Sequence, residues 1–166
     1  MKKKVLFSLL LVCMLFMLSG CFLDKVDILN KGKSYKELLN LYIEAYSEPS
    51  LEKTAEVFPP FYMEFSKDFM TQEYLEDLLA KEKQTYGDDL KLSYELTNEE
   101  GTKLTDEELE KLNDKMASYY KSTEKASECY KYEGKMYMKG SITENSFSLS
   151  VLKYCKYGND WYLVNY

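Results

Sequence analysis

The stretch that decides the fold class is VLKYCKYGNDWYLVNY, residues 151–166. Its centre, YGN at 157–159, is a tight-turn signal of the kind that joins two antiparallel strands. In the strand after the turn, Trp161 and Leu163 alternate with neighbours that point to the other side. We expect Trp161 and Leu163 to be buried against a layer of helices. The stretch therefore predicts a closing β-hairpin packed on helices.

The strands that precede this hairpin are predicted from period-two patterns. Leu90, Leu92, Tyr94 and Leu96 alternate with polar residues, which indicates a half-buried strand. From Ser127 onward the chain is typical of three strands. These are ECYKYEGKMYMKG (128–140) with a bulge at Gly134, SFSLSVLKYCKY (146–157) after a turn, and DWYLVNY (160–166).

Helices are expected before and between these strands. SYKE at 34–37 and TDEE at 105–108 are capping boxes, each of which starts a helix. A short helix over 51–58 should stop at the prolines 59 and 60, and another should begin at Thr71 and end near YGDD. The aromatic segment FYMEFSKDFM (61–70) leaves two alternatives open, core packing or the lining of a pocket. The order predicts an α+β fold, with N-terminal helices on one face of a curved antiparallel sheet and a helical insertion after the first strand.

The first 21 residues are typical of a lipoprotein signal. MKKK is followed by 14 uncharged, largely apolar residues, Val5 to Leu18, as in a secretory signal. LSGC at 18–21 resembles the lipobox of bacterial lipoproteins, which implies a diacylglycerol thioether on Cys21 and cleavage before it. We expect a signal peptide over 1–20, a tether over 21–33 and a single domain over 34–166. Two acyl chains would hold the protein stably on the membrane.

Composition excludes several classes of function. The chain has no His and no Arg, which removes Ser-His and Cys-His pairs, His metal ligands and bidentate Arg clamps. It has no CxxC pair, GxGxxG or phosphate loop, so we expect no metal and no cofactor. Removal of residues 1–20 would lower 22 lysines to 19 against 28 acidic residues, a balance of −9. Such a chain is a poor candidate for nucleic acid. The abundance of Lys, Tyr and Asn suggests an AT-rich genome and, with the lipobox, a Gram-positive source.

Three stretches together resemble NTF2-like lipoprotein domains. They are SYKELLNLYIEAYSEPSLEKTAEVFPP (34–60), LTDEELEKLND (104–114) and the closing hairpin at 151–166. The resemblance implies a cone-shaped sheet around a pocket, in a family dominated by non-enzymatic members. Catalytic members use an Asp or a His–Asp pair inside the cone. Because this chain has no His and Glu95 falls on the polar side of its strand, the resemblance assigns no catalytic residue.

Two functions are compatible with these observations. The first is a lipid-anchored, non-catalytic binding or interaction domain on the outer face of the cell membrane. Its ligand would be a partner protein, a cell-wall polymer or a small apolar molecule. The second is an enzyme that uses a buried carboxylate or Tyr in the NTF2-like pocket. The 16 tyrosines also suggest sugar binding, although Tyr is common in half-buried strands for packing reasons alone.

Cys129 and Cys155 are candidates for a disulfide. In an antiparallel hairpin, the two residue numbers of every directly opposed pair add to the same total. If Met136 shares a buried face with Phe147 and the turn lies at 142–143, this total is 285. A one-residue bulge at Gly134 lowers this total to 284, which places the two cysteines opposite each other about 5 Å apart at Cα. The compartment outside the membrane permits oxidation. A turn at TENS (143–146) instead would separate them.

Overall fold

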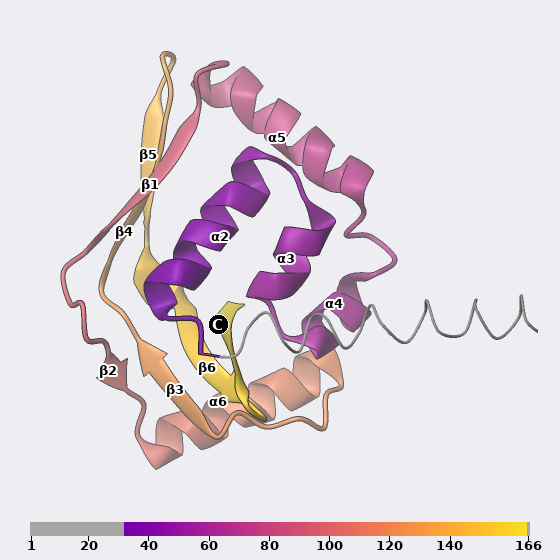
Figure 1. The fold of residues 1–166 in the computed structure, drawn as a ribbon, viewed down its shortest axis with the longest axis vertical. Coiled ribbons are helices and arrows are strands. Elements are labelled where there is room, and N and C mark those ends of the chain that lie inside the picture. The colour runs from indigo at the N-terminus through magenta and orange to yellow at the C-terminus, as the bar shows by residue number, and fades with distance from the viewer. Residues whose placement is uncertain (1–31, 166) are drawn as a thin grey trace, which may run out of the picture.

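The fold is α+β, and the computed structural model describes residues 32–165. The predicted signal peptide, Cys21 and nearly all of the predicted tether lie outside the described residues. Within them are five α-helices and two antiparallel sheets (Figure 1). The helices are α2 (Tyr35–Ser47), α3 (Leu51–Val57), α4 (Pro60–Ser66), α5 (Gln72–Tyr86) and α6 (Asp106–Tyr120).

Both predicted capping boxes are confirmed. The Ser34 hydroxyl accepts a hydrogen bond from the Glu37 N–H, and the Glu37 carboxylate accepts one from the Ser34 N–H. Thr105 and Glu108 make the same reciprocal pair at the start of α6. These bonds satisfy N–H groups that have no partner inside a helix, so each helix begins at a defined residue.

The prolines end one helix and begin the next. α3 stops before Pro59, as predicted, and Pro60 takes the first position of α4, where its missing N–H costs nothing. The first half of segment 61–70 is therefore helical, and the chain then runs through a turn to α5. Thr71 caps α5 by accepting a hydrogen bond from the Tyr74 N–H at 3.1 Å.

The strands form one three-stranded and one four-stranded sheet. The first has the order β1-β4-β5 and the second β2-β3-β6-β7. The strands are β1 (Lys91–Leu96), β2 (Thr102–Lys103), β3 (Glu128–Lys131), β4 (Gly134–Lys139), β5 (Glu144–Ser148), β6 (Leu152–Tyr157) and β7 (Asp160–Asn165). The predicted alternation along β1 is confirmed, with Glu95 on the exposed side. The two-residue strand β2 had no period-two pattern long enough to predict it.

The prediction of one continuous strand over 128–140 is wrong. The chain leaves one sheet after β3 and enters the other at Gly134, which has φ +156°. A Cβ at this position would lie 2.2 Å from the carbonyl oxygen of Glu95 on the neighbouring strand. Gly134 is therefore the point where the chain changes sheets, and only glycine allows that close approach.

The prediction of one strand over 146–157 is also wrong. A 3₁₀ turn, Leu149–Val151, separates β5 from β6. Met136 pairs with Phe147, so pairs across β4 and β5 add to 283 and not to 285. The stretch with the 3₁₀ turn, between Ser148 and Lys153, is one residue longer than the stretch between Lys131 and Lys135 opposite it. The paired residue numbers across β3 and β6 therefore add to 284. Cys129 consequently pairs with Cys155, although the irregularity lies in the other strand from the one expected.

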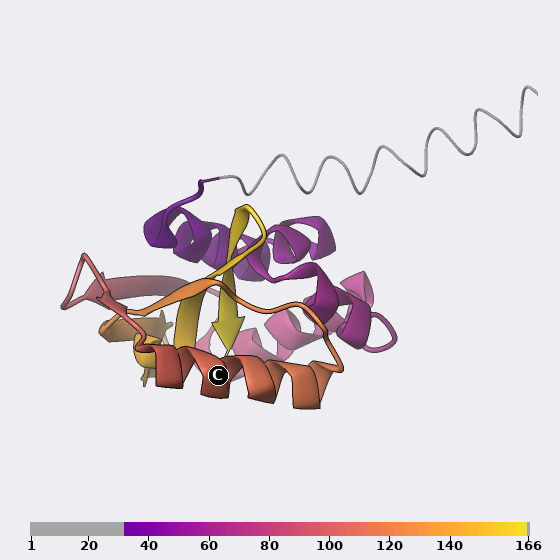
Figure 2. The same cartoon turned by 90° about the horizontal axis from the view of Figure 1, so that it is seen from below.

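Helices cover both faces of the four-stranded sheet: α2 and α3 lie on one face, which is compatible with the prediction, and α6, the expected helical insertion, covers the other. Figure 2 shows β6 and β7 between α2 and α3 on one side and α6 on the other. Leu163 packs with α2 and α3, whereas Tyr162 and Val164 pack with α6. All three are buried, while Trp161, predicted to be buried, is half-buried and stacks on Tyr154 with 4.3 Å between ring centroids.

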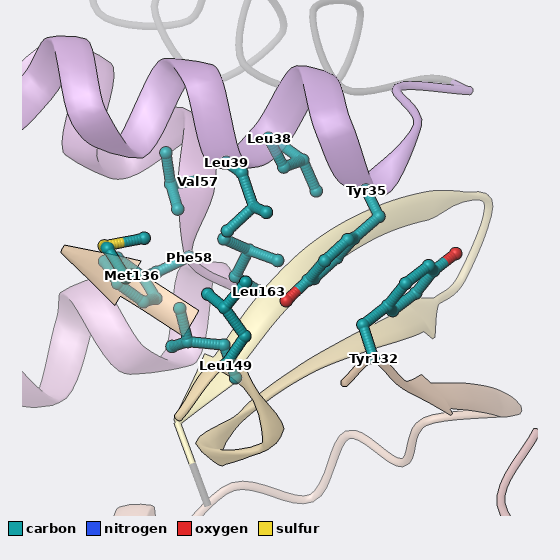
Figure 3. Packing of buried hydrophobic residues seen from close by; sticks show 10 residues of the cluster. Tyr35, Leu38, Leu39, Val57, Phe58, Tyr132, Met136, Leu149 and Leu163 are labelled. Atoms are coloured by element: carbon teal, nitrogen blue, oxygen red, sulfur yellow. The ribbon is translucent and has the colours of Figure 1, made fainter. Parts of the chain in front are cut away.

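The space between α2, α3 and the sheets is filled by side chains. Leu39, Met136, Leu149 and Leu163 are fully buried there (Figure 3). At one end Tyr35 stacks on Tyr132, with ring centroids 3.8 Å apart. Where the resemblance implied a pocket inside a cone, this interior is a packed core.

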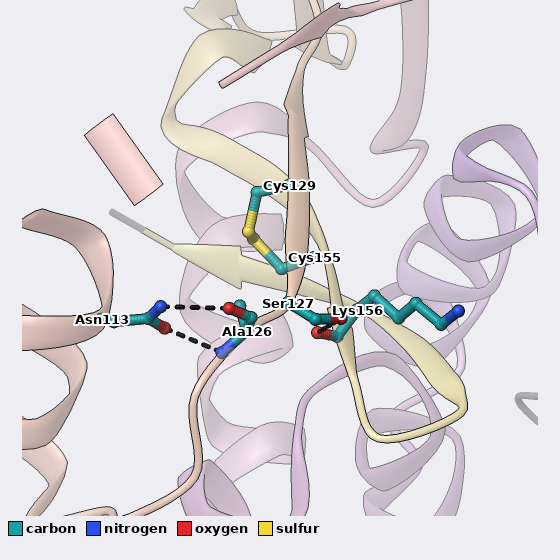
Figure 4. Close-up of a disulfide and its surroundings, with 6 residues drawn as sticks. All are labelled: Asn113, Ala126, Ser127, Cys129, Cys155 and Lys156. Atoms are coloured by element: carbon teal, nitrogen blue, oxygen red, sulfur yellow. Dashed lines mark hydrogen bonds between the residues drawn. A yellow bond between two sulfur atoms is a disulfide. The ribbon is translucent and has the colours of Figure 1, made fainter. Parts of the chain in front are cut away.

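The second core lies under α6 and contains a disulfide. Cys129 and Cys155 are joined with Cα atoms 4.1 Å apart, and both are fully buried (Figure 4). Asn113 of α6 fixes the chain that leads into β3. Its side chain accepts a hydrogen bond from the Ala126 N–H at 2.8 Å and donates one to the Ala126 carbonyl at 3.0 Å.

The chain enters the fold through a fixed residue. The Lys33 carbonyl accepts a hydrogen bond from the Tyr154 hydroxyl at 2.6 Å, and the Lys33 ammonium lies 2.7 Å from a Glu56 carboxylate oxygen. Lys33 is thus bound both to β6 and to α3 immediately before α2 begins.

Candidate functional site

A groove between α2 and α5, here called the α2–α5 groove, is the candidate binding site. It has a volume of about 210 Å³ and lies among the four N-terminal helices and one end of the β6–β7 ladder. Its lining is Tyr42, Ala45, Tyr46, Thr54, Val57, Phe58, Tyr62, Met70, Tyr74, Leu75, Leu78, Leu152 and Asn165.

The floor and inner wall of the groove belong to the folded core. Leu152 and Asn165, which pair across β6 and β7, lie at the end of that hairpin. Ala45 projects from α2, and Val57 ends α3; both are buried. The polar group on this wall is satisfied, because the Thr54 hydroxyl donates to the Ser50 carbonyl at 2.8 Å. The inner wall is therefore well packed and largely apolar.

The outer wall is α5, which is fixed at its two ends. At the start, the Gln72 amide accepts from the Leu51 N–H at 3.1 Å and donates to the Pro49 carbonyl at 2.7 Å. At the end, the Tyr86 carbonyl accepts from the Ile142 N–H at 2.9 Å. Between these ends Leu75 and Leu78 face the groove and stay half-buried. α5 thus spans the groove with leucines that have incomplete packing.

Tyrosine phenols surround the opening. Burial, together with the nearby Tyr62 phenol, raises the pKa of Tyr42, and burial with the nearby Tyr74 raises the pKa of Tyr62. Burial and the Glu82 carboxylate raise the pKa of Tyr46 far above its usual range. These phenols are therefore neutral at physiological pH. Hydrogen-bond partners for the hydroxyls of Tyr42, Tyr46, Tyr62 and Tyr74 are absent from the described part of the chain.

An exposed aromatic ridge continues from the groove to the end of α6. Phe65 and Phe69 are 41% and 54% exposed and lie edge to face, with ring centroids 6.3 Å apart. Phe65 also contacts Tyr119, which is 65% exposed. Tyr120 connects this ridge to the groove because its ring lies 5.4 Å from that of Tyr62. Segment 61–70 thus contributes both to the groove and to the ridge, and the core alternative holds only for part of it.

The groove provides binding chemistry and no acid–base pair. Among the described residues that line it there is no Asp, Glu or Lys. Glu95, on β1, points to solvent, where the Tyr137 hydroxyl donates to it at 3.3 Å. Cys129 and Cys155 lie in the other core, under α6, and so contribute nothing to the groove.

Two other hollows have a different character. One of about 410 Å³ lies at the β6–β7 turn and contains Glu124 and Asp160. Another of about 400 Å³ borders the last turns of α6 and shares Asn165 with the groove. Within residues 32–165 there is no cluster of three or more His, Cys, Asp or Glu able to hold a metal ion. The same residues include no helix of the length and apolarity that crossing a membrane requires.

The sequence had one usable signal for this site. The lining includes four tyrosines from α2, α4 and α5 and two leucines from α5, and residues at helical spacing usually mark core packing. Only the aromatic density of segment 61–70 suggested a pocket. Comparison of the chain with models of protein families, with curated proteins and with solved structures gives no match.

Proposed function

We propose that this protein is a lipid-anchored binding domain on the outer face of the cell membrane, which captures its ligand in the α2–α5 groove without chemical conversion. The observation that carries the proposal is the groove itself, an uncharged aromatic cavity next to a fully packed core. Cavities of this type, apolar with a few convergent polar groups, are the usual sites for small ligands.

The proposed location rests on sequence and is supported by the disulfide. A basic segment, an apolar segment and LSGC occur in order before Cys21. Disulfides such as Cys129–Cys155 persist in oxidising compartments and are rare in the cytosol. An acylated Cys21 would keep the domain at the membrane surface, as two acyl chains suffice for stable anchoring.

Binding without catalysis is favoured by the state of the tyrosines. A tyrosine that acts as a base needs a lowered pKa, whereas burial raises the pKa of Tyr42 and Tyr62. The groove also offers no carboxylate among its described lining residues to serve as an acid or a nucleophile. The enzymatic alternative therefore has neither a tyrosine base nor a carboxylate among the described lining residues.

Two measurements test this proposal. Cys21→Ala should leave an unprocessed or released protein, whereas the parent should take up labelled acyl chains and stay in the membrane fraction. A photoreactive amino acid at Tyr74, on the rim of the groove, should form an adduct in intact cells. The same group at Tyr137, a half-buried residue of β4 that does not line the groove, is the matched control. Equal adduct formation at both positions would exclude the groove as the binding site.

A further inference from the structure

The lining of the α2–α5 groove limits the charge of its ligand. A charged group brought into such a site needs an opposite charge or several hydrogen bonds, or its burial is strongly unfavourable. The described lining supplies neither a carboxylate for a cation nor an ammonium for an anion. Glu82, which lies outside the lining, is beside Tyr46 at one end, where it would repel an anion and could attract a cation only at that end. The ligand that fits is uncharged.

The tyrosines of the groove determine which polar group the ligand can carry. Tyr42, Tyr62 and Tyr74 lie near one another, and their hydroxyls have spare donor capacity. Because these phenols stay protonated, they can donate hydrogen bonds to a hydroxyl, ester or carbonyl oxygen. The groove therefore combines one polar edge with apolar walls.

The apolar walls of the groove determine the shape of the apolar part of the ligand. Leu75, Leu78 and Met70 are flexible side chains that suit an alkyl chain better than a flat polar ring. Sugars usually stack on open aromatic faces, but here Phe58 and Tyr62 stack on each other, with centroids 4.8 Å apart. The rings of Tyr42 and Phe58 are perpendicular to each other, with an interplanar angle of 89°. These three rings are occupied by one another, so none of them offers a carbohydrate a free aromatic face.

We propose that the α2–α5 groove binds an uncharged amphiphile, namely an alkyl chain that carries a hydroxyl, ester or carbonyl oxygen. A cavity of about 150 Å³ holds a benzene ring, so the groove accommodates roughly eight carbons or the end of a longer chain. The oxygen lies at the phenols and the chain lies against α5. This assignment rests on the proposed binding function and specifies its ligand.

The test uses the full chain in membranes prepared from cells that produce it. Three photoreactive eight-carbon probes with the same click tag are compared, one ending in an alcohol, one in a carboxylate and one in an amine. Labelled peptides are identified by mass spectrometry. The alcohol should label the peptides that contain Tyr42 and Leu78 at least about tenfold more than either charged probe, since burial of an unpaired charge is strongly unfavourable.

Two variants with matched controls test the geometry. Leu78→Arg should abolish this labelling, whereas Phe147→Arg, at an exposed apolar position on β5, should not. The double variant Tyr42→Phe with Tyr62→Phe keeps the rings and removes two hydroxyls. A fourth probe with the same chain and no polar end group, an alkane, serves as the reference. The double variant should reduce the preference for the alcohol over this alkane, because only Tyr74 of the three neighbouring phenols keeps its hydroxyl, whereas Tyr137→Phe should preserve it. A diacylglycerol with the same photoreactive chain, supplied in phosphatidylcholine vesicles, distinguishes a ligand taken from the bilayer from one taken from water.

The outcomes separate this inference from the proposed function. Equal labelling by all three probes, or labelling that survives Leu78→Arg, overturns the uncharged amphiphile. So does an adduct at Tyr74 that contains a protein or a glycan, although a binding function for the groove would then stand. Absence of any adduct at Tyr74 in cells, with no labelling by the alcohol, overturns both.

Discussion

Reduction of the Cys129–Cys155 disulfide should destabilise the domain strongly. The two cysteines are 26 residues apart in sequence, so the bond closes a loop of that size in the unfolded chain. Chain entropy gives about 3 kcal/mol for a 15-residue loop and about 4.7 kcal/mol for 100 residues, which places this bond near 3.5 kcal/mol. For a domain of this size, a loss of that magnitude lowers the melting midpoint by about 10–15 °C.

Circular dichroism of the chain from residue 22 onward, melted with and without a reductant, measures this shift. Cys129→Ala with Cys155→Ala is the matched control. It should melt below the oxidised parent, and its midpoint should not respond to the reductant. Thiol labelling of the denatured, unreduced parent should detect no free thiol at either position. Two free thiols, or a midpoint that reduction leaves unchanged, would refute the reasoning.

Three further substitutions test the fold, each by urea or thermal unfolding. Gly134→Ala should lower the free energy of unfolding by more than about 2 kcal/mol, because the new Cβ meets the Glu95 carbonyl oxygen. Gly158→Ala, with open space around it, should lower it by about 1 kcal/mol. Similar losses for the two variants would contradict the change of sheet at Gly134. Leu163→Ala should lower the free energy of unfolding by about 3–4 kcal/mol and Trp161→Ala by about 2 kcal/mol, because the leucine is fully buried and the tryptophan is not. A larger loss for Trp161→Ala than for Leu163→Ala would show that the indole belongs to the core. Asn113→Ala should cost about 2–4 kcal/mol since it leaves a buried N–H and a buried carbonyl unpaired, and a cost below 1 kcal/mol would contradict this role.

Features that depend on neighbouring residues could be predicted from the sequence. The capping boxes at Ser34 and Thr105 are local hydrogen-bond patterns, and both helices begin where these patterns place them. The alternation along β1 and the turn at Gly158 are local in the same sense. In each case the information needed lies within a few residues.

Features that depend on contacts between residues far apart in the chain could not be predicted from the sequence. The change of sheet at Gly134 is set by the approach of Glu95, which is far away in sequence, so the same glycine is compatible with a bulge. Burial of both faces of β7 follows from the placement of α6, which its own period does not reveal. The groove collects residues from four helices and two strands, and each of them alone fits ordinary core packing. The aromatic segment 61–70 shows the limit most clearly, because one helix contributes to the pocket and to the surface.

The fixation of Lys33 gives the domain a defined response to mechanical load. If the protein hangs from Cys21, any tension along the chain reaches the fold at this residue. There the load is divided between the Tyr154 hydroxyl and the Glu56 carboxylate, before α2 can be pulled from its end. Tyr154 lies next to Cys155 on β6, and the disulfide passes the force on to β3 by a covalent path. A drag on the domain would thus be shared between the cross-linked strands, through Tyr154, and α3, through Glu56.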